Sequence, residues 1–157
     1  MASYVRDLIE YHGIDSCSYE NASIFKQFNT ENTFTLPTEK PDIEQIVKVR
    51  GEAKIKDYKI VKTPIGTSLE GQNVTGYKLL VCGTLKLQYE YVANEATQSV
   101  HSAINSFPFC EYVVLPGDFY PQAMMFTTVC IEDMYSQQIG TRDIYNNITA
   151  MIVVEVC

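Results

Sequence analysis

The chain of 157 residues has no tryptophan, only two histidines, and no long apolar run. A membrane-spanning helix needs about 20 predominantly apolar residues, so the sequence predicts no membrane span. Lys and Arg number 12 against 19 Asp and Glu, which gives a net charge of −7. An acidic chain without a Lys/Arg cluster is a poor match for nucleic acid, because binding there depends on neutralising phosphates.

A secretory signal is also missing from the start of the chain, MASYVRDLIEYHGIDSCSYE. Arg6, Asp7 and Glu10 stand where a signal peptide would need an uninterrupted apolar core. We therefore expect the product to stay, at first, in the cell that makes it.

Hydrophobic residues make up 46% of the chain and charged residues 20%, values that are ordinary for a folded globular protein. The length suits one domain with a sizeable core. We divide the chain into an N-terminal arm over residues 1–24 and a β domain over residues 25–157.

Strand patterns dominate the β domain. VKVRGEAKI alternates apolar and charged residues, and YKLLVCGTLKLQYEYVA is the longest such pattern. Gly83 interrupts its apolar face, which indicates a bulge or a close approach of backbone. Short strands between turn residues predict an antiparallel β-sandwich, jelly-roll-like, with a barrel as the alternative. We also expect one helical turn beginning at Pro41 and a bend at Pro108 between two strands.

The arm carries a pattern of a different period. Val5, Leu8, Ile9 and His12 recur at helical spacing, and Gly13 follows them. This predicts a short amphipathic helix.

Catalytic and metal sites have little support. A Cys–His nucleophilic pair would need His101 beside Cys110, but nine residues and Pro108 separate them. Glu132 and Asp133 are adjacent, so on a strand they point to opposite faces and do not act together. We expect no enzyme activity, no cofactor and no metal.

Five cysteines stand far apart, with no pair closer than twenty residues: Cys17, Cys82, Cys110, Cys130 and Cys157. This spacing excludes a zinc finger. We expect the three internal cysteines to be mostly small buried hydrophobes. An odd number leaves at least one thiol without an internal partner, and the accessible positions of Cys17 and Cys157 make them candidates for a bridge between chains.

Four blocks of sequence together resemble the SPOCS domain family of endospore-forming bacteria. They are LPTEKPDIEQIVKVRGEAKI at 36–55, VTGYKLLVCGTLKLQYEYVA at 74–93, QSVHSAINSFPFCEYVVLP at 98–116 and VCIEDMYSQQIGTRDIYNNITAMIVV at 129–154. The resemblance covers roughly residues 25–157. It implies a role in building the spore envelope, with synthesis in the mother-cell cytoplasm and a final place in the spore coat or on the spore surface.

The family's best-known member carries a peptidoglycan-binding LysM module, which this sequence lacks. We therefore expect a structural subunit that assembles with itself into a layer or a filament, through an arm that includes Val5, Leu8, Ile9 and Tyr11. A bridge through Cys17 or Cys157 would lock the assembly. The alternative is a module that does not polymerise and that recruits other spore-coat proteins during sporulation.

Overall fold

The protein folds into eight β-strands in a computed structural model, which describes residues 2–15, 24–67, 73–119 and 123–156. The strands are β1 (Ala2–Arg6), β2 (Ile9–Ile14), β3 (Ile24–Thr35), β4 (Ile43–Thr67), β5 (Asn73–Ala93), β6 (Val100–Val114), β7 (Met125–Gln138) and β8 (Asp143–Val156). No helix in these ranges is long and apolar enough to cross a membrane. The all-β prediction is confirmed.

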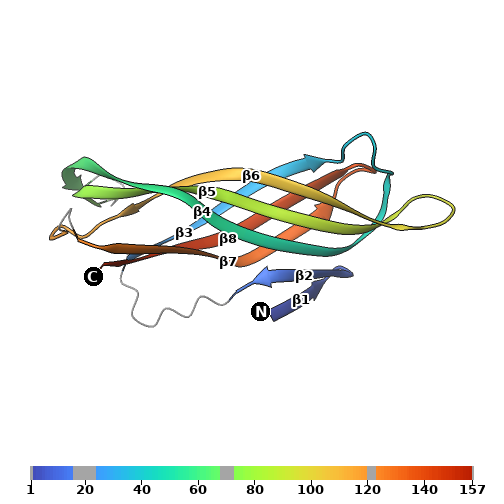
Figure 1. Cartoon of the computed structure of the whole chain (residues 1–157), viewed down its shortest axis with the longest axis horizontal. Coiled ribbons are helices and arrows are strands. Elements are labelled where there is room, and N and C mark those ends of the chain that lie inside the picture. The colour runs from blue at the N-terminus through green and yellow to red at the C-terminus, as the bar shows by residue number, and fades with distance from the viewer. Residues whose placement is uncertain (1, 16–23, 68–72, 120–122, 157) are drawn as a thin grey trace.

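The strands follow one path, β3-β8-β7-β2-β4-β5-β6, with β1 paired to β2. The path folds back on itself into two layers, β3-β8-β7 and β4-β5-β6 (Figure 1). The two strands at the ends of this path, β3 and β6, contact each other through side chains. The rings of Phe28 and Phe109 stack there with their centres 5.2 Å apart. The sheet is not closed into a barrel, so the sandwich prediction is confirmed and the barrel alternative is wrong. Pairing is antiparallel except at β2, which runs parallel to β4 and β7.

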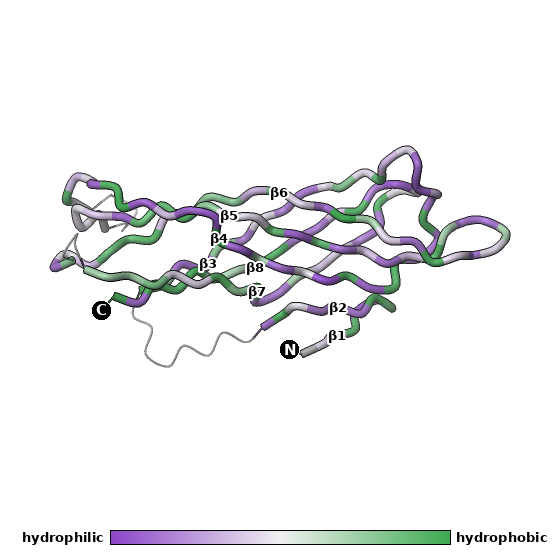
Figure 2. Tube along the Cα trace, viewed as in Figure 1, coloured by the Kyte–Doolittle hydropathy of each residue, from purple (hydrophilic) through white to green (hydrophobic). Residues whose placement is uncertain are grey.

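The core lies between the two layers and follows the predicted alternation. In β5 the buried side chains are Leu79, Val81, Leu85, Leu87, Tyr89, Tyr91 and Ala93. Figure 2 shows the same change from apolar to polar residues along the long strands. Gly83 lies opposite a bulge in β4, and a Cβ there would stand 2.1 Å from the carbonyl oxygen of Lys54. A close approach of two backbones therefore requires glycine at this position.

The expected N-terminal helix is wrong, because residues 2–14 form the β1–β2 hairpin. Asp7 and Leu8 connect its strands with φ of 52° and 69°. Two consecutive residues with positive φ form the tight turn whose twist suits a hairpin. Backbone pairing with β4 and β7 stabilises β2 as a strand, and this outweighs the helical spacing of a short segment.

The helical turn expected at Pro41 is also wrong. The chain turns earlier, where the Lys40 amide donates to the Pro37 carbonyl oxygen at 3.0 Å, and β4 starts at Ile43. Ile43 and Ile46 are buried, so the segment is held extended by pairing with β5.

The expected bend at Pro108 is absent, because β6 runs unbroken through this residue. Cys82 and Cys110 face each other with Cα atoms 4.2 Å apart, a spacing typical of a pair without ladder hydrogen bonds. Pro108 faces Thr84 two residues along, at the same kind of position. Its missing N–H therefore costs no ladder bond, and an edge strand accommodates it.

Candidate assembly surface

The β1–β2 hairpin is built into the sandwich by one of its two strands. β2 lies between β4 and β7, with Tyr11 beside Val49 of β4 and Ile14 beside Ile131 of β7. Ile9, Tyr11 and Ile14 are buried in the core of their own chain. Of the four residues expected to form an assembly arm, Ile9 and Tyr11 are thus engaged within the subunit.

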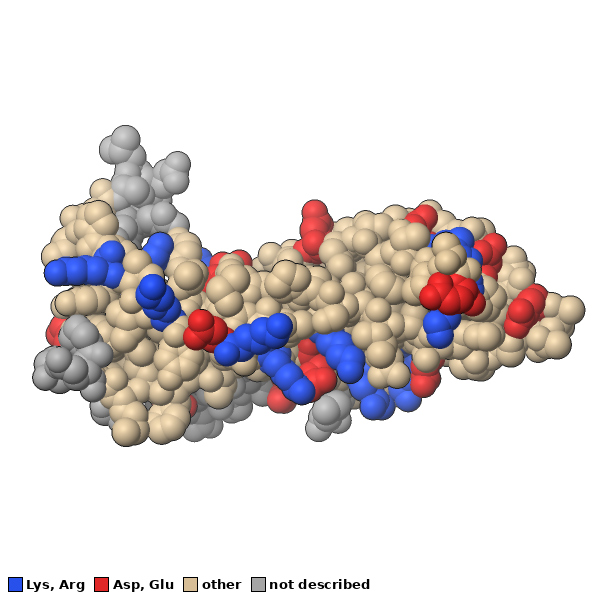
Figure 3. All heavy atoms as spheres, turned by 45° about the horizontal axis from the view of Figure 1, so that its top comes forward, with Lys and Arg blue, Asp and Glu red and all other residues tan. Residues whose placement is uncertain are grey.

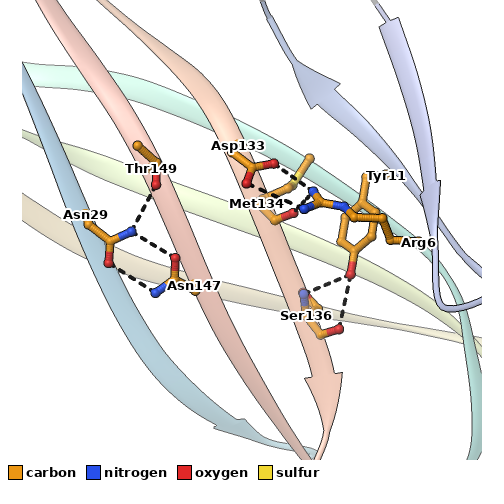
Figure 4. A network of polar contacts seen from close by, with 8 residues as sticks. All are labelled: Arg6, Tyr11, Asn29, Asp133, Met134, Ser136, Asn147 and Thr149. Atoms are coloured by element: carbon orange, nitrogen blue, oxygen red, sulfur yellow. Dashed lines mark hydrogen bonds and ion pairs between the residues drawn. The ribbon is translucent and has the colours of Figure 1, made fainter.

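Tyr11 fastens β2 to β7 through its hydroxyl group (Figure 4). The hydroxyl accepts from the backbone N–H of Ser136 at 2.9 Å and donates to the Ser136 carbonyl oxygen at 3.1 Å. The Tyr11 hydroxyl thereby satisfies the N–H and the C=O of Ser136, as a neighbouring strand would. Burial raises the pKa of Tyr11, although the bond to Ser136 acts in the opposite direction.

Arg6 at the end of β1 fastens the hairpin a second time. Its Nη2 lies 2.7 Å from Oδ1 of Asp133, it also donates to the Met134 carbonyl oxygen, and its guanidinium lies 5.0 Å from the centre of the Tyr11 ring (Figure 4). The side chains of Arg6 and Asp133 are 39% and 56% exposed. Such an exposed pair contributes about 1 kcal/mol or less, so its main effect is to fix the orientation of the hairpin.

The tip of the hairpin presents apolar side chains to solvent. Val5 is 70% exposed and Leu8 78% exposed, and Tyr4 on the same strand is 48% exposed. Leu8 also adopts a left-handed backbone conformation, with φ of 69°. For a residue other than glycine, that conformation costs about 1–2 kcal/mol. The other two expected arm residues, Val5 and Leu8, are therefore free of the core and held outward.

Among the described residues, each of the strands β1, β3 and β6 has one backbone edge that no other strand pairs with. β6 exposes Val100 and Ile104, and β3 exposes Phe25. An open edge with apolar side chains is suited to pairing with a strand of another chain.

The cysteines are placed in two different ways. Cys82 of β5 and Cys110 of β6 form a disulfide, so the prediction that the internal cysteines are mostly small buried hydrophobes is wrong for this pair. Cys130 also takes part in a disulfide. Cys17 and Cys157 lie outside the described residues. The register of β5 against β6 brings Cys82 and Cys110 together, and sequence spacing alone did not reveal it.

His101 binds a loop instead of a thiol. Its Nε2 lies 3.0 Å from the Ser99 hydroxyl and 3.5 Å from the carboxylate of Glu95, and its ring stacks on Tyr91. The hydrogen bond from Ser99 lowers the pKa of Glu95. Cys110 lies nine residues further along the same strand, about 30 Å away. The structure thus separates the one nucleophile pair that the sequence offered.

Comparison with known proteins gives one match. No curated protein and no solved structure matches the chain. A family model described as SipL, SPOCS domain matches residues 42–139, which is more than half of the chain. The matched range begins one residue before β4 and ends one residue after β7, so the β1–β2 hairpin lies outside it. The chain therefore belongs to the SPOCS domain family and is a sporulation-related protein.

Proposed function

We propose that this protein is a structural subunit of the spore envelope that assembles with copies of itself into a coat or exosporium layer or a surface filament. One observation carries the proposal: the hairpin is anchored by buried residues, yet its tip presents apolar side chains to solvent. The sporulation context comes from the family. The proposal includes no catalytic step and no cofactor.

The hairpin tip supports the proposal through its strained conformation. Leu8 is 78% exposed and has a left-handed backbone, so the folded subunit gains little from having leucine there. Strained residues that persist in a fold often serve an interaction. In an assembly, Val5 and Leu8 would be buried against a neighbour, and the open edge of β1 would offer backbone groups to it.

The cysteine count supports a covalent lock. Five cysteines cannot all pair within one chain, so at least one sulfur is left over in each subunit. In the proposed assembly, Cys17 or Cys157 forms a bridge to another subunit once the mother cell lyses and the surroundings become oxidising. On a non-reducing gel, we expect the C17S or the C157S variant to lose the cross-linked bands of the wild type. C82S/C110S should keep them, because that pair lies within one subunit.

The hairpin is tested by the double variant Val5→Ser/Leu8→Asn. Both side chains are exposed, and asparagine tolerates a left-handed backbone, so the subunit should keep its stability. Size-exclusion chromatography and negative-stain microscopy should show assemblies for the wild type and mostly monomer for the variant. Ile65→Ser is a matched control, since Ile65 is 84% exposed at the far end of β4.

Two results would contradict the proposal. The double variant could assemble as the wild type does, which would remove the hairpin from the contact. Alternatively, the wild type could stay monomeric at high concentration under oxidising conditions, which would favour a module that recruits coat proteins without polymerising.

A further inference from the structure

β4 and β5 carry a positive net charge in a chain that is acidic as a whole. β4 and β5 hold eight of the 12 Lys and Arg residues but four of the 19 Asp and Glu residues, a net charge of +4. Since the chain carries −7, the remaining residues carry −11. In Figure 3 many of the Lys and Arg side chains in view gather in a band along the molecule.

The outer face of β4 and β5 is the basic side. It carries Lys48, Arg50, Lys54, Lys59, Lys78 and Lys86 against Glu52, Asp57 and Glu90. Arg50 and Lys86 border a shallow hollow of about 370 Å³, which Glu52 also lines. Among the described residues, no carboxylate lies within ion-pair distance of either side chain. The basic face thus offers cations that the subunit itself leaves unpaired.

The outer face of the other layer is acidic. Its carboxylates are Glu31 of β3, Glu132 and Asp133 of β7, and Asp143 and Glu155 of β8. The expectation that Glu132 and Asp133 point to opposite faces is wrong, because the register of β7 shifts between Ile131 and Asp133 and both carboxylates lie on the outer side. β7 and β8 contain no Lys or Arg, and the lysine of β3, Lys26, lies over the Tyr112 ring of β6.

Neutral donors hold two of these carboxylates in place. Glu31 accepts from the Tyr145 hydroxyl at 2.6 Å, and Glu132 accepts from the Gln27 amide at 2.8 Å. These donors orient the carboxylates without cancelling their charge. Arg6 of β1 pairs with Asp133, but no cation of the described residues lies within ion-pair distance of the other four carboxylates, so the face keeps a negative charge.

We propose that subunits stack front to back, with the basic β4–β5 face of one copy against the acidic β3-β8-β7 face of the next. This inference rests on the proposed self-assembly and adds a second contact to the one that the hairpin tip makes. The occupant of the basic face is a second copy, because the complementary charge is present on the opposite side of the same subunit. A front-to-back contact is heterologous and does not close by itself, so it propagates into a filament. Sheets pack about 10 Å apart, so two layers per subunit give a repeat of about 20 Å.

Charge reversal on each face tests the stacking. Arg50→Glu/Lys86→Glu makes both faces acidic, and Glu31→Lys/Glu132→Lys/Glu155→Lys makes both faces basic. An exposed pair changes an association constant about 1.5- to 5-fold, so the loss of two such pairs should weaken the association of the basic-face variant alone about 2- to 25-fold relative to the wild type, and the third reversal should weaken the acidic-face variant further. A one-to-one mixture of the two variants should recover association, because opposite faces then meet in alternation. Sedimentation velocity at two salt concentrations measures these effects, and salt should weaken the wild-type association.

A matched control shows whether weaker association results from the charges on the basic face or from the change in net charge. Lys40→Glu/Lys62→Glu changes the net charge by the same amount as the basic-face variant, but Lys40 lies in a turn and Lys62 lies at the far end of β4. We expect it to associate within about twofold of the wild type, since neither lysine borders the hollow. Circular dichroism and the thermal midpoint verify folding, and Arg50→Gln/Lys86→Gln serves as a milder variant if a reversal fails to fold.

Three outcomes would overturn the inference. In the first, both face variants associate as tightly as the wild type, which leaves self-assembly intact and removes only the charged faces. In the second, the mixture fails to recover association. In the third, Arg50→Glu/Lys86→Glu loses binding to poly-glutamate while self-association is unchanged, which would assign the basic face to an acidic polymer. Failure of the wild type to associate would instead overturn the proposed function and this inference together.

Discussion

Replacing Tyr11 with phenylalanine removes one oxygen atom and two hydrogen bonds. The hydroxyl serves the N–H and the C=O of Ser136, at 2.9 and 3.1 Å, in a buried setting. A phenylalanine ring keeps the packing but leaves both backbone groups without this partner. Each unsatisfied buried group costs about 1–3 kcal/mol, and partial relaxation reduces the sum, so we expect a loss of about 2–4 kcal/mol in the free energy of unfolding.

That loss corresponds to a fall of about 5–15 °C in the thermal midpoint of a chain of this size. Urea unfolding, monitored by circular dichroism, measures the loss in free energy of unfolding. Tyr4→Phe is a matched control, because Tyr4 is 48% exposed and its hydroxyl has no hydrogen-bond partner among the described residues. For this control we expect a change below about 0.5 kcal/mol.

Hydrogen exchange locates the effect. In Tyr11→Phe, the amides of β2 should exchange faster than in the wild type, while amides of β5 should keep most of their relative protection. Equal unfolding midpoints for Tyr11→Phe and Tyr4→Phe would refute the claim that the Tyr11 hydroxyl anchors the hairpin in its own subunit.

Three further outcomes test the fold. Gly83→Ala should lower the free energy of unfolding by about 2–3 kcal/mol, because a Cβ there would stand 2.1 Å from the Lys54 carbonyl oxygen; an unchanged urea midpoint would contradict the close approach. Cys82→Ser/Cys110→Ser should lower stability by about 3–4 kcal/mol, since the disulfide closes a loop with a sequence separation of 28; a thermal midpoint equal to that of the wild type would be evidence against this. Burial raises the pKa of Tyr89 above its ordinary value of 10.0, so stability that is fully present below pH 10 should fall as the pH rises further, because the unfolded chain loses its phenolic proton first. Urea midpoints and tyrosinate absorbance, measured from about pH 9 to about pH 11.5, should show the loss of stability and the ionisation of tyrosine over the same pH range. A midpoint that does not change with pH would refute the raised pKa of Tyr89.

The strands of the β domain could be predicted from alternation, because their apolar residues meet one core. In β5 the predicted inner face, including Leu79, Leu85 and Tyr89, is the buried face. The hairpin could not be predicted in this way. Val5, Leu8 and Ile9 fit a helix by their spacing, and only the adjacent strands β4 and β7 make Ile9 and Tyr11 inward residues of a strand.

The candidate surfaces were only partly visible in the sequence. Val5 and Leu8 could be identified as apolar residues in a terminal segment, but their exposure depends on the turn at Asp7 and Leu8. The cations of VKVRGEAKI alternate with apolar residues, which in the sequence indicates only a strand with one solvated face, and the net charge of −7 gives no sign of a basic surface. The significance of these cations follows from the topology, which places them on one layer and the carboxylates of β3, β7 and β8 on the other.

Sedimentation velocity of the purified full chain over a wide concentration range, under oxidising and reducing conditions, tests self-assembly most directly. We expect large species that grow with concentration and that negative-stain microscopy shows as filaments or layers, with the oxidised species persisting on dilution. A single 17.8 kDa species at every concentration under oxidising conditions would contradict the proposed role as a self-assembling subunit.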